Sequence, residues 1–213
     1  MSKEANPTKT EVFNTADYNR SLREYEYYLE FSRKDLQGKT ILDVGSGKEL
    51  LFSREAREAG ITVISMNPEL GKDETMRKKL TKKLPWYRNK RLKAGVDEAR
   101  SRTMAARAQA IPLQDESVDV ITGLFSATSY IKDPEELKQA FDEMMRVLKP
   151  GGNAYFRHFD NWRGLGITNQ IDKVNEAVEV FKEKGYMVDH KISKSRNNWA
   201  PFGLLKITKP KNS

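Results

Sequence analysis

Short apolar runs alternate with amphipathic stretches along most of this chain. The runs are long enough to form strands that are buried on both faces, as in a parallel sheet. They lie at about 40–44, 61–66, 118–124 and 153–158. Helix-forming residues follow the first run at about 48–59, and Asp133-Pro134 after the third run is typical of a helix cap and a first helical position. This alternation predicts an α/β protein.

The pattern also predicts elements at the edges of the sheet. An N-terminal helix is expected from apolar residues at helical spacing. These residues are Tyr18, Leu22, Tyr25 and Leu29. A short third strand is expected near 107–110. We therefore divide the chain into an N-terminal segment and helix, 1–37, and a larger domain, 38–213.

The last part of the chain predicts one more helix and two strands. Apolar residues recur at helical spacing from Ile171 to Phe181, and Gly185 is typical of the end of such a helix. The strands that follow are expected at about 186–193 and 202–208.

The stretch from Thr40 to Gly47 carries the most information about function. Its apolar run ends in Gly45-Ser-Gly47, which lets backbone N–H groups approach a ligand closely, and a helix follows. A strand, a glycine turn and a helix in this order make the first ligand-binding corner of a doubly wound sheet. A dinucleotide fingerprint needs a third glycine three residues later, where this chain has Leu50, so the pyrophosphate interpretation is poor.

Three motifs in order resemble class I S-adenosylmethionine (AdoMet)-dependent methyltransferases. Asp43-x-Gly45-x-Gly47 resembles their first motif. Residues 110–123, AIPLQDESVDVITG, resemble their "A-L-P-F-x-D-x-S-F-D-V-V" segment, and residues 146–152, RVLKPGG, match the turn before their fifth strand. The chain is identified as a member of the broad type 11 group. The resemblance implies a Rossmann-like sheet of seven strands, mostly parallel with an antiparallel last strand and helices on both faces.

The same resemblance assigns the cofactor site residue by residue. It implies that Asp43 faces the amino end of AdoMet, that the glycine turn approaches the methionine and ribose, and that Asn67 meets the ribose hydroxyls. Gln109 and Ile111 would face the adenine, and Phe125 would line the pocket after the fourth strand. The residues assigned to AdoMet are Asp43, Gly45, Ser46, Gly47, Asn67, Gln109, Ile111 and Phe125.

Two of these positions depart from the family pattern. Asn67 stands where relatives have an acidic residue for the ribose, and Glu69 is an alternative partner. Arg107-Ala-Gln109 stands where an acidic residue often accepts from the adenine amino group, so the Gln109 carbonyl or a backbone carbonyl would take that role. The two neutral contacts leave open a degenerate member that does not catalyse.

Methyl transfer needs a general base only when the acceptor carries a proton. His158 and Asp160, just past the fifth strand, are the best-placed bases, and Tyr130 is the next choice. A structural, hydrogen-bonded role for His158 is the alternative. His190 is expected to lie in a late strand away from the site. Neither histidine is accompanied in the sequence by other metal-ligating residues at a suitable spacing, so no metal is expected.

A basic insertion at about 70–107 accounts for the positive charge of the chain. Lys72 to Arg107 contains 13 Lys or Arg against 4 Asp or Glu, whereas the whole chain has a net charge of +8. Apolar residues every four positions predict a basic amphipathic helix there. Three interpretations stay open: an RNA-binding insert, a lid over a small acceptor, or a solvated surface helix.

Composition narrows the class of protein. The chain has 213 residues, enough for one doubly wound domain, and no cysteine, so disulfides and thiolate chemistry are excluded. We expect no signal peptide and no membrane span, and a cytoplasmic location. The expected function is AdoMet-dependent methyl transfer to O, N or C of a small molecule. RNA methylation, a non-catalytic binding role and, more distantly, a nicotinamide-dependent reductase are the alternatives, and the sequence leaves the oligomeric state open.

Overall fold

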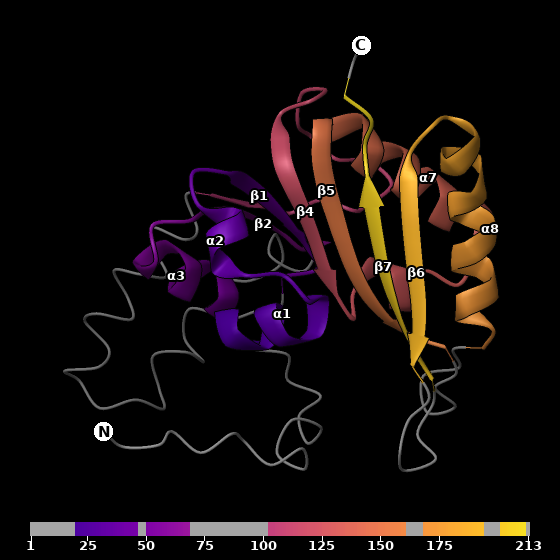
Figure 1. Ribbon diagram of the computed structural model, residues 1–213, viewed down its shortest axis with the longest axis horizontal. Coiled ribbons are helices and arrows are strands. Elements are labelled where there is room, and N and C mark those ends of the chain that lie inside the picture. Colours follow the sequence, from indigo (N-terminus) through magenta and orange to yellow (C-terminus); the bar gives the residue numbers. More distant parts are fainter. Residues whose placement is uncertain (1–19, 47–49, 69–101, 161–167, 194–200, 212–213) are drawn as a thin grey trace.

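A computed structural model describes residues 20–46, 50–68, 102–160, 168–193 and 201–211 of the chain (Figure 1). Its centre is a seven-stranded sheet with the strand order β3-β2-β1-β4-β5-β7-β6. The strands are β1 Thr40–Val44, β2 Thr62–Met66, β3 Thr103–Met104, β4 Val118–Leu124, β5 Leu148–Phe159, β6 Met187–Ser193 and β7 Phe202–Thr208. The first five strands pair in parallel, and β7 pairs antiparallel with both β5 and β6. The predicted Rossmann-like sheet is therefore confirmed.

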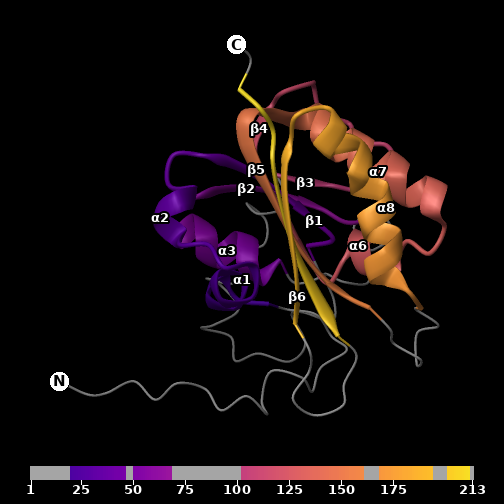
Figure 2. The same cartoon turned by 45° about the vertical axis from the view of Figure 1, so that its right-hand side comes forward.

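Helices cover both faces of the sheet, as predicted. One group comprises α1 Leu22–Leu29, α2 Arg33–Leu36 and α3 Leu51–Glu58. The other comprises α6 Ala127–Tyr130, α7 Pro134–Val147 and α8 Gln170–Glu183. Figure 2 shows the two groups on opposite sides of the strands. No helix in the described part of the chain is long and apolar enough to cross a membrane.

Two separate apolar clusters follow from this arrangement, because successive side chains of a strand point to opposite faces. Leu42 and Ile121 pack with α7 and α8 on one face. Their neighbours Ile41 and Val120 pack with α1 and α3 on the other face. The central strands are thus buried on both sides, which explains why they read as continuous apolar runs.

Local signals set the helix starts. The Asp133 side chain accepts a hydrogen bond from Glu136 N at 2.9 Å, and Pro134 occupies the first helical position of α7. At α1, Ser21 and Glu24 form a capping box. The N-terminal helix is therefore confirmed from Leu22 onward, whereas Tyr18 lies outside the described residues.

The predicted third strand at 107–110 is wrong. The strand is Thr103–Met104, because Ser65 N donates to Arg102 O at 2.9 Å and Asn67 N donates to Met104 O at 3.1 Å. Residues 107–110 instead form a turn, closed by Ala110 N donating to Arg107 O at 3.1 Å. Two further boundaries move: β5 begins at Leu148 rather than 153, and α3 begins after Leu50, which has the left-handed φ of 56°.

Candidate functional site

A cavity of about 420 Å³ opens at the carboxyl ends of the first strands of the sheet. It is bordered by Val44 and Gly45 at the end of β1, and by residues that follow β2, β3 and β4. The lining consists of Arg20, Val44, Gly45, Met66, Asn67, Pro68, Ala106, Arg107, Ala108, Gln109, Phe125, Ser126, Ala127, Tyr130 and Ile131. This is the edge where open α/β sheets bind their ligands.

Gly45 makes the cavity wall possible. Its φ is +81°, and its N–H donates to Met66 O at 2.7 Å, which ties the end of β1 to β2. A Cβ placed on Gly45 would lie 2.3 Å from Ser126 Cβ, so any side chain would collide with the loop after β4. Both the backbone conformation and the close approach require glycine.

Phe125 shapes the opposite wall. It has a left-handed φ of 50°, unusual for an aromatic residue, and its N–H donates to Arg157 O at 2.7 Å. Its ring stacks on Phe159 with centroids 4.2 Å apart. Strained backbone of this kind is held by surrounding contacts and is common at functional sites.

Arg20 borders the cavity from the N-terminal segment, and no pattern in the sequence indicates this. Its Nη1 donates to Leu124 O at 3.3 Å, and its guanidinium lies 4.9 Å from the centre of the Phe125 ring. The partners are more than a hundred residues away in the chain. Only the folded structure brings the cation to this place.

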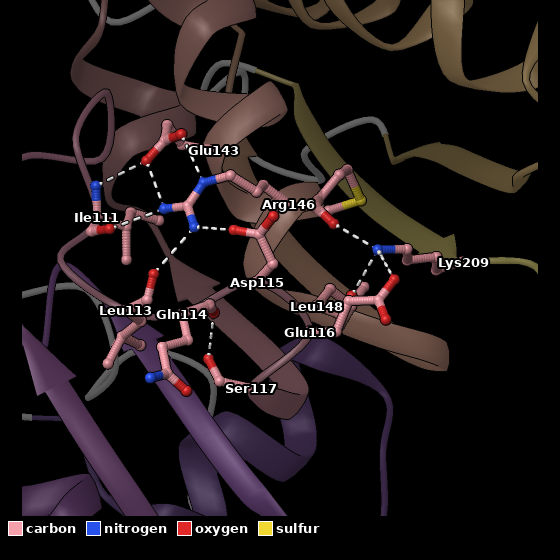
Figure 3. Close-up of polar contacts among 11 residues, drawn as sticks. Ile111, Leu113, Gln114, Asp115, Glu116, Ser117, Glu143, Arg146, Leu148 and Lys209 are labelled. Carbon is pink, nitrogen blue, oxygen red and sulfur yellow. Dashed lines mark hydrogen bonds and ion pairs between the residues drawn. The ribbon is translucent and has the colours of Figure 1, made fainter.

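Helix α7 supports the turn at 107–110 from the side away from the cavity. Gln109 Nε2 donates to Glu136 Oε2 at 3.1 Å. Figure 3 shows how Arg146 secures the segment that follows, donating to Ile111 O at 2.8 Å and to Leu113 O at 2.9 Å. Glu143 accepts from Ile111 N at 3.0 Å. The RVLKPGG motif thus positions the cavity wall without lining it.

Ion pairing strengthens that support. Arg146 contacts Glu143 at 2.8 Å and Asp115 at 2.6 Å. The hydrogen bond from Arg146 lowers the pKa of the Glu143 carboxyl, and the same acidic partners raise the pKa of Arg146. A charged pair that also bonds backbone atoms fixes the loop geometry.

The structure places the residues assigned to AdoMet in two groups. Gly45, Asn67, Gln109 and Phe125 line the cavity. Ser46 is buried beside it, with its N–H donating to Met66 O at 3.2 Å, and Gly47 lies outside the described residues.

Ile111 does not line the cavity; it is buried in the core cluster on the α7 and α8 face. Apolar walls come instead from residues that the sequence analysis did not assign to the cofactor. These are Met66, Pro68, Ala106, Ala108 and Ile131.

Asp43 lies behind the cavity wall and is fully buried. Its Oδ1 accepts from Tyr25 Oη at 2.9 Å and from Thr122 Oγ1 at 3.0 Å, and its Oδ2 accepts from Tyr25 Oη at 3.1 Å. Burial raises the pKa of Asp43 to about 7, although the two hydroxyl hydrogen bonds act in the opposite direction. Asp43 therefore joins β1, β4 and α1, and it is not among the residues that line the cavity.

Of the three predicted bases, only Tyr130 lines the cavity, and its side chain is 42% exposed. Asp160 Oδ1 accepts from Ile171 N at 3.0 Å and so supports the start of α8. His158 is fully buried on the α8 side of β5, outside the cavity lining. The catalytic roles of these three residues stay predictions, and the geometry favours Tyr130.

His158 has a partner that the sequence did not reveal. Its Nε2 lies 3.0 Å from Nε2 of His190, the residue that we expected to lie away from the site. His190 Nδ1 lies 2.7 Å from Asn175 Oδ1, which can only accept, so His190 Nε2 is the acceptor for the His158 N–H. Burial lowers the pKa of His158 to about 3. Within the described ranges, no group of three or more His, Asp or Glu side chains could hold a metal ion.

Comparison with known proteins decides the family. A family model described as a methyltransferase domain matches residues 42–156, more than half of the chain. The chain belongs to this methyltransferase family. The match begins in β1 and ends in β5, so it contains every described residue that lines the cavity except Arg20.

Individual relatives are distant. An uncharacterized methyltransferase of Mycobacteroides abscessus is 29% identical over 157 residues, which are 71% of this chain and 53% of that protein. The methyltransferase chain thus spans about half the length of this relative.

Two solved structures share the fold. A SAM-dependent methyltransferase of Methanosarcina mazei has a TM-score of 0.53 at 16% identity, covering 82% of this chain and 93% of that one. The 1,6-didemethyltoxoflavin-N1-methyltransferase of Burkholderia thailandensis, with 1,6-didemethyltoxoflavin and S-adenosylhomocysteine bound, has a TM-score of 0.56 at 12% identity. Here 89% of this chain and 78% of that one are covered. At these identities the similarity concerns the fold.

Proposed function

We propose that this chain is an AdoMet-dependent methyltransferase that acts on a small-molecule acceptor. One observation carries the proposal: the end of β1, Asn67 after β2 and Gln109 after β3 border one cavity at the ligand-binding edge of the sheet. All of these positions lie within the part of the chain that matches the methyltransferase family model.

The residues present fit the cofactor. The volume of about 420 Å³ lies in the range of small-molecule pockets, about 300–1,000 Å³. The Asn67 amide can both accept from and donate to ribose hydroxyls. Because Gln109 Nε2 donates to Glu136, its carbonyl oxygen is the acceptor that it offers to an adenine amino group. The buried Ser126 hydroxyl at the cavity wall has no hydrogen-bond partner among the described residues and suits a polar ligand atom.

When bound, AdoMet supplies a methyl group already activated on a sulfonium. The task left to the chain is to orient the two reactants, because proximity and alignment can remove several kcal/mol of the barrier. Gly45 and Ser126 set the width of the cavity, and Phe125 fixes one wall. Tyr130, at the exposed rim, is the residue best placed to contact an acceptor hydroxyl or amine.

The acceptor is proposed as a small molecule because the cavity is small and because a solved methyltransferase of this fold has 1,6-didemethyltoxoflavin and S-adenosylhomocysteine bound. The atom that receives the methyl group depends on the chemical identity of the acceptor.

Calorimetry tests the proposal directly. The wild-type chain is titrated with AdoMet, S-adenosylhomocysteine and NADH. We expect both AdoMet and S-adenosylhomocysteine to bind at one site, NADH not to bind, and Asn67→Ala to weaken the two nucleosides. Absence of heat with AdoMet and S-adenosylhomocysteine at millimolar concentration would support a non-catalytic member and contradict the proposal. Heat with NADH alone would point to the reductase.

The basic insertion keeps RNA as a second candidate acceptor. Its charge supports this candidate, but most of the segment, including Lys78, Lys79, Lys82 and Lys83, lies outside the described residues. Charge reversal at these four lysines should abolish RNA binding and its steep salt dependence if RNA is the acceptor. If wild type binds RNA only weakly and the variant binds it equally well, this role for the insertion is excluded.

A further inference from the structure

Strand β6 lies at an edge of the sheet (Figure 1). Within the described part of the chain, its seven residues pair with β7 alone. Helix α8 contacts β6 through one face of the strand, where His190 Nδ1 lies 2.7 Å from Asn175 Oδ1. The outer backbone N–H and C=O groups of such an edge form a template for a further strand.

The side chains of β6 differ between its two faces. Val188 packs against the core cluster on the α7 and α8 face, and Ile192 lies on the same face because side chains alternate along a strand. Ile192 is 55% exposed. Asp189 and Lys191 lie together on the opposite face, with Lys191 Nζ 3.7 Å from Asp189 Oδ2. An apolar pair and an opposite-charge pair are thus arranged symmetrically about His190.

This symmetry makes the edge complementary to itself. Two copies related by a two-fold axis perpendicular to the sheet pair their β6 strands antiparallel, with one residue of the strand at the centre. When that residue is His190, Asp189 of each copy lies directly opposite Lys191 of the other. On the other face, Val188 lies opposite Ile192. Opposite charges directly across a strand pair contribute about 0.2–1 kcal/mol each, whereas like charges there are destabilising.

Neighbouring registers lack this complementarity. A centre one residue away, at Asp189 or Lys191, places that charge directly opposite the same charge of the other copy. A centre two residues away pairs only the residues at one end of the strand. His190 itself can lie opposite its own copy, because burial lowers its pKa and so favours the neutral ring near pH 7. The register centred on His190 therefore pairs the whole strand without opposing like charges.

We propose that β6 pairs with β6 of a second copy of this chain, in the antiparallel register centred on His190. The interface is isologous, so the same residues serve both copies and the edge is closed. It lies at the opposite end of the sheet order from β3, and the inference does not depend on the proposed function. A single strand pair makes a small interface, so the dimer is expected to be weak and concentration-dependent.

Exchange of the charges at 189 and 191 tests both the partner and the register. Sedimentation equilibrium to millimolar concentration compares wild type with Asp189→Lys, Lys191→Asp and the double variant that carries both changes. Each single variant opposes like charges at both positions, whereas the double variant restores opposite charges. Both side chains are exposed, by 60% and 61%, so the fold should be retained, which thermal unfolding checks. Lys138→Asp on the exposed face of α7 is the control, because it changes the net charge as Lys191→Asp does.

We expect wild type, the double variant and Lys138→Asp to dimerise with similar affinity. Asp189→Lys and Lys191→Asp should each weaken dimerisation by about tenfold or more. A one-to-one mixture of these two single variants should associate, although neither does so well alone. In that mixture one copy presents two positive charges at the edge and the other presents two negative charges.

Three results would overturn the proposal. The first is a wild type that stays monomeric at millimolar concentration. The second is a wild-type dimer whose affinity the two single variants retain, which would place the interface elsewhere. The third is a loss of dimer in both single variants that neither their mixture nor the double variant restores, which would rule out the register.

Discussion

Each half of the sheet contains one fully buried titratable side chain, and the two side chains have different hydrogen-bond partners. Asp43 on β1 and His158 on β5 are both fully buried, and both were predicted to work in the site. Asp43 accepts from hydroxyls of α1 and β4 directly behind the cavity wall, and so links that wall to the helix that follows Arg20. His158 instead donates to His190 across β7, on the face covered by α8.

This difference shows that a position at a strand end does not define a role by itself. The face of the sheet to which a side chain points determines whether it lies near the cavity. On β5, Phe159 points toward the α1 side and stacks on the cavity residue Phe125, whereas its neighbour His158 points toward α8. The half of the sheet that contains β1 and β4 therefore carries the cavity, and the β5-β7-β6 half carries the histidine pair.

The largest effect is expected at the glycine turn. Gly45→Ala should reduce the affinity for S-adenosylhomocysteine by about a hundredfold or more, equivalent to about 2.8 kcal/mol. The new Cβ would meet Ser126 Cβ at 2.3 Å and push the two cavity walls apart. Calorimetry measures the loss.

Gly185→Ala is the matched control for that variant. Gly185 has the same φ of +81°, but nothing lies within 4 Å of its added Cβ. It should cost about 1 kcal/mol of folding free energy and leave ligand affinity unchanged. Equal affinities in the two alanine variants would show that the close approach at Gly45 does not shape the cavity.

A loss of stability without loss of binding is expected in the other half of the sheet. In Gly203→Ala, the new Cβ would lie 2.2 Å from His158 Nε2 and 2.6 Å from His190 Nε2. Overpacking of this kind costs about 1–3 kcal/mol, which urea denaturation measures. His190→Ser in the same chain should recover part of it. A destabilisation that the second substitution does not relieve would contradict the packing of the pair.

Tyr25 should matter through its hydroxyl alone. Tyr25→Phe removes the hydroxyl that donates to both carboxylate oxygens of the buried Asp43. A buried acceptor left without a hydrogen bond costs about 1–3 kcal/mol of folding free energy. Tyr27→Phe, two residues away and 64% exposed, should have an unfolding free energy close to that of the wild type. If the two variants unfold at the same urea concentration, Asp43 does not depend on Tyr25.

Opposite pH slopes are expected from the two buried titratable groups. The pKa of Asp43 is raised to about 7 in the folded state, from about 3.9 in the unfolded state. Because the unfolded chain ionises first, stability falls as the pH rises between these two values. Relative to Asp43→Asn, the wild type should lose stability from pH 5 to pH 7, by at most about 1.4 kcal/mol per pH unit.

His158 should give the reverse sign. Its folded-state pKa is lowered to about 3, below the ordinary value of about 6.5, so the unfolded chain takes up a proton first as pH falls. Relative to His158→Asn, the wild type should gain stability as pH rises from 4 to 6.5. Denaturation curves at four pH values measure both slopes, and slopes of the same sign would refute the contrast between the two halves.

Local patterns in the sequence were sufficient for features that depend on neighbouring residues. The β1 glycine turn and the Asp133 cap each follow from residues within one element and the turn beside it. Asn67, in contrast, was assigned from the family resemblance. The mostly parallel sheet of seven strands with an antiparallel last strand followed from the family resemblance.

Contacts between distant segments could not be read in this way. Arg20 reaches Leu124, Tyr25 reaches Asp43, and His158 meets His190 only after the sheet has formed. The third strand was misplaced for the same reason: the two residues 103–104 form a strand because β2 offers them hydrogen bonds, and their own sequence carries too short a pattern.

The most direct test of the central claim is a crystal structure of the chain with S-adenosylhomocysteine. We predict the adenine beside Ala106–Gln109, the ribose at Asn67 and the amino acid end between Gly45 and Phe125. A cavity closed by protein side chains, with the ligand absent at saturating concentration or bound at another surface, would contradict the account.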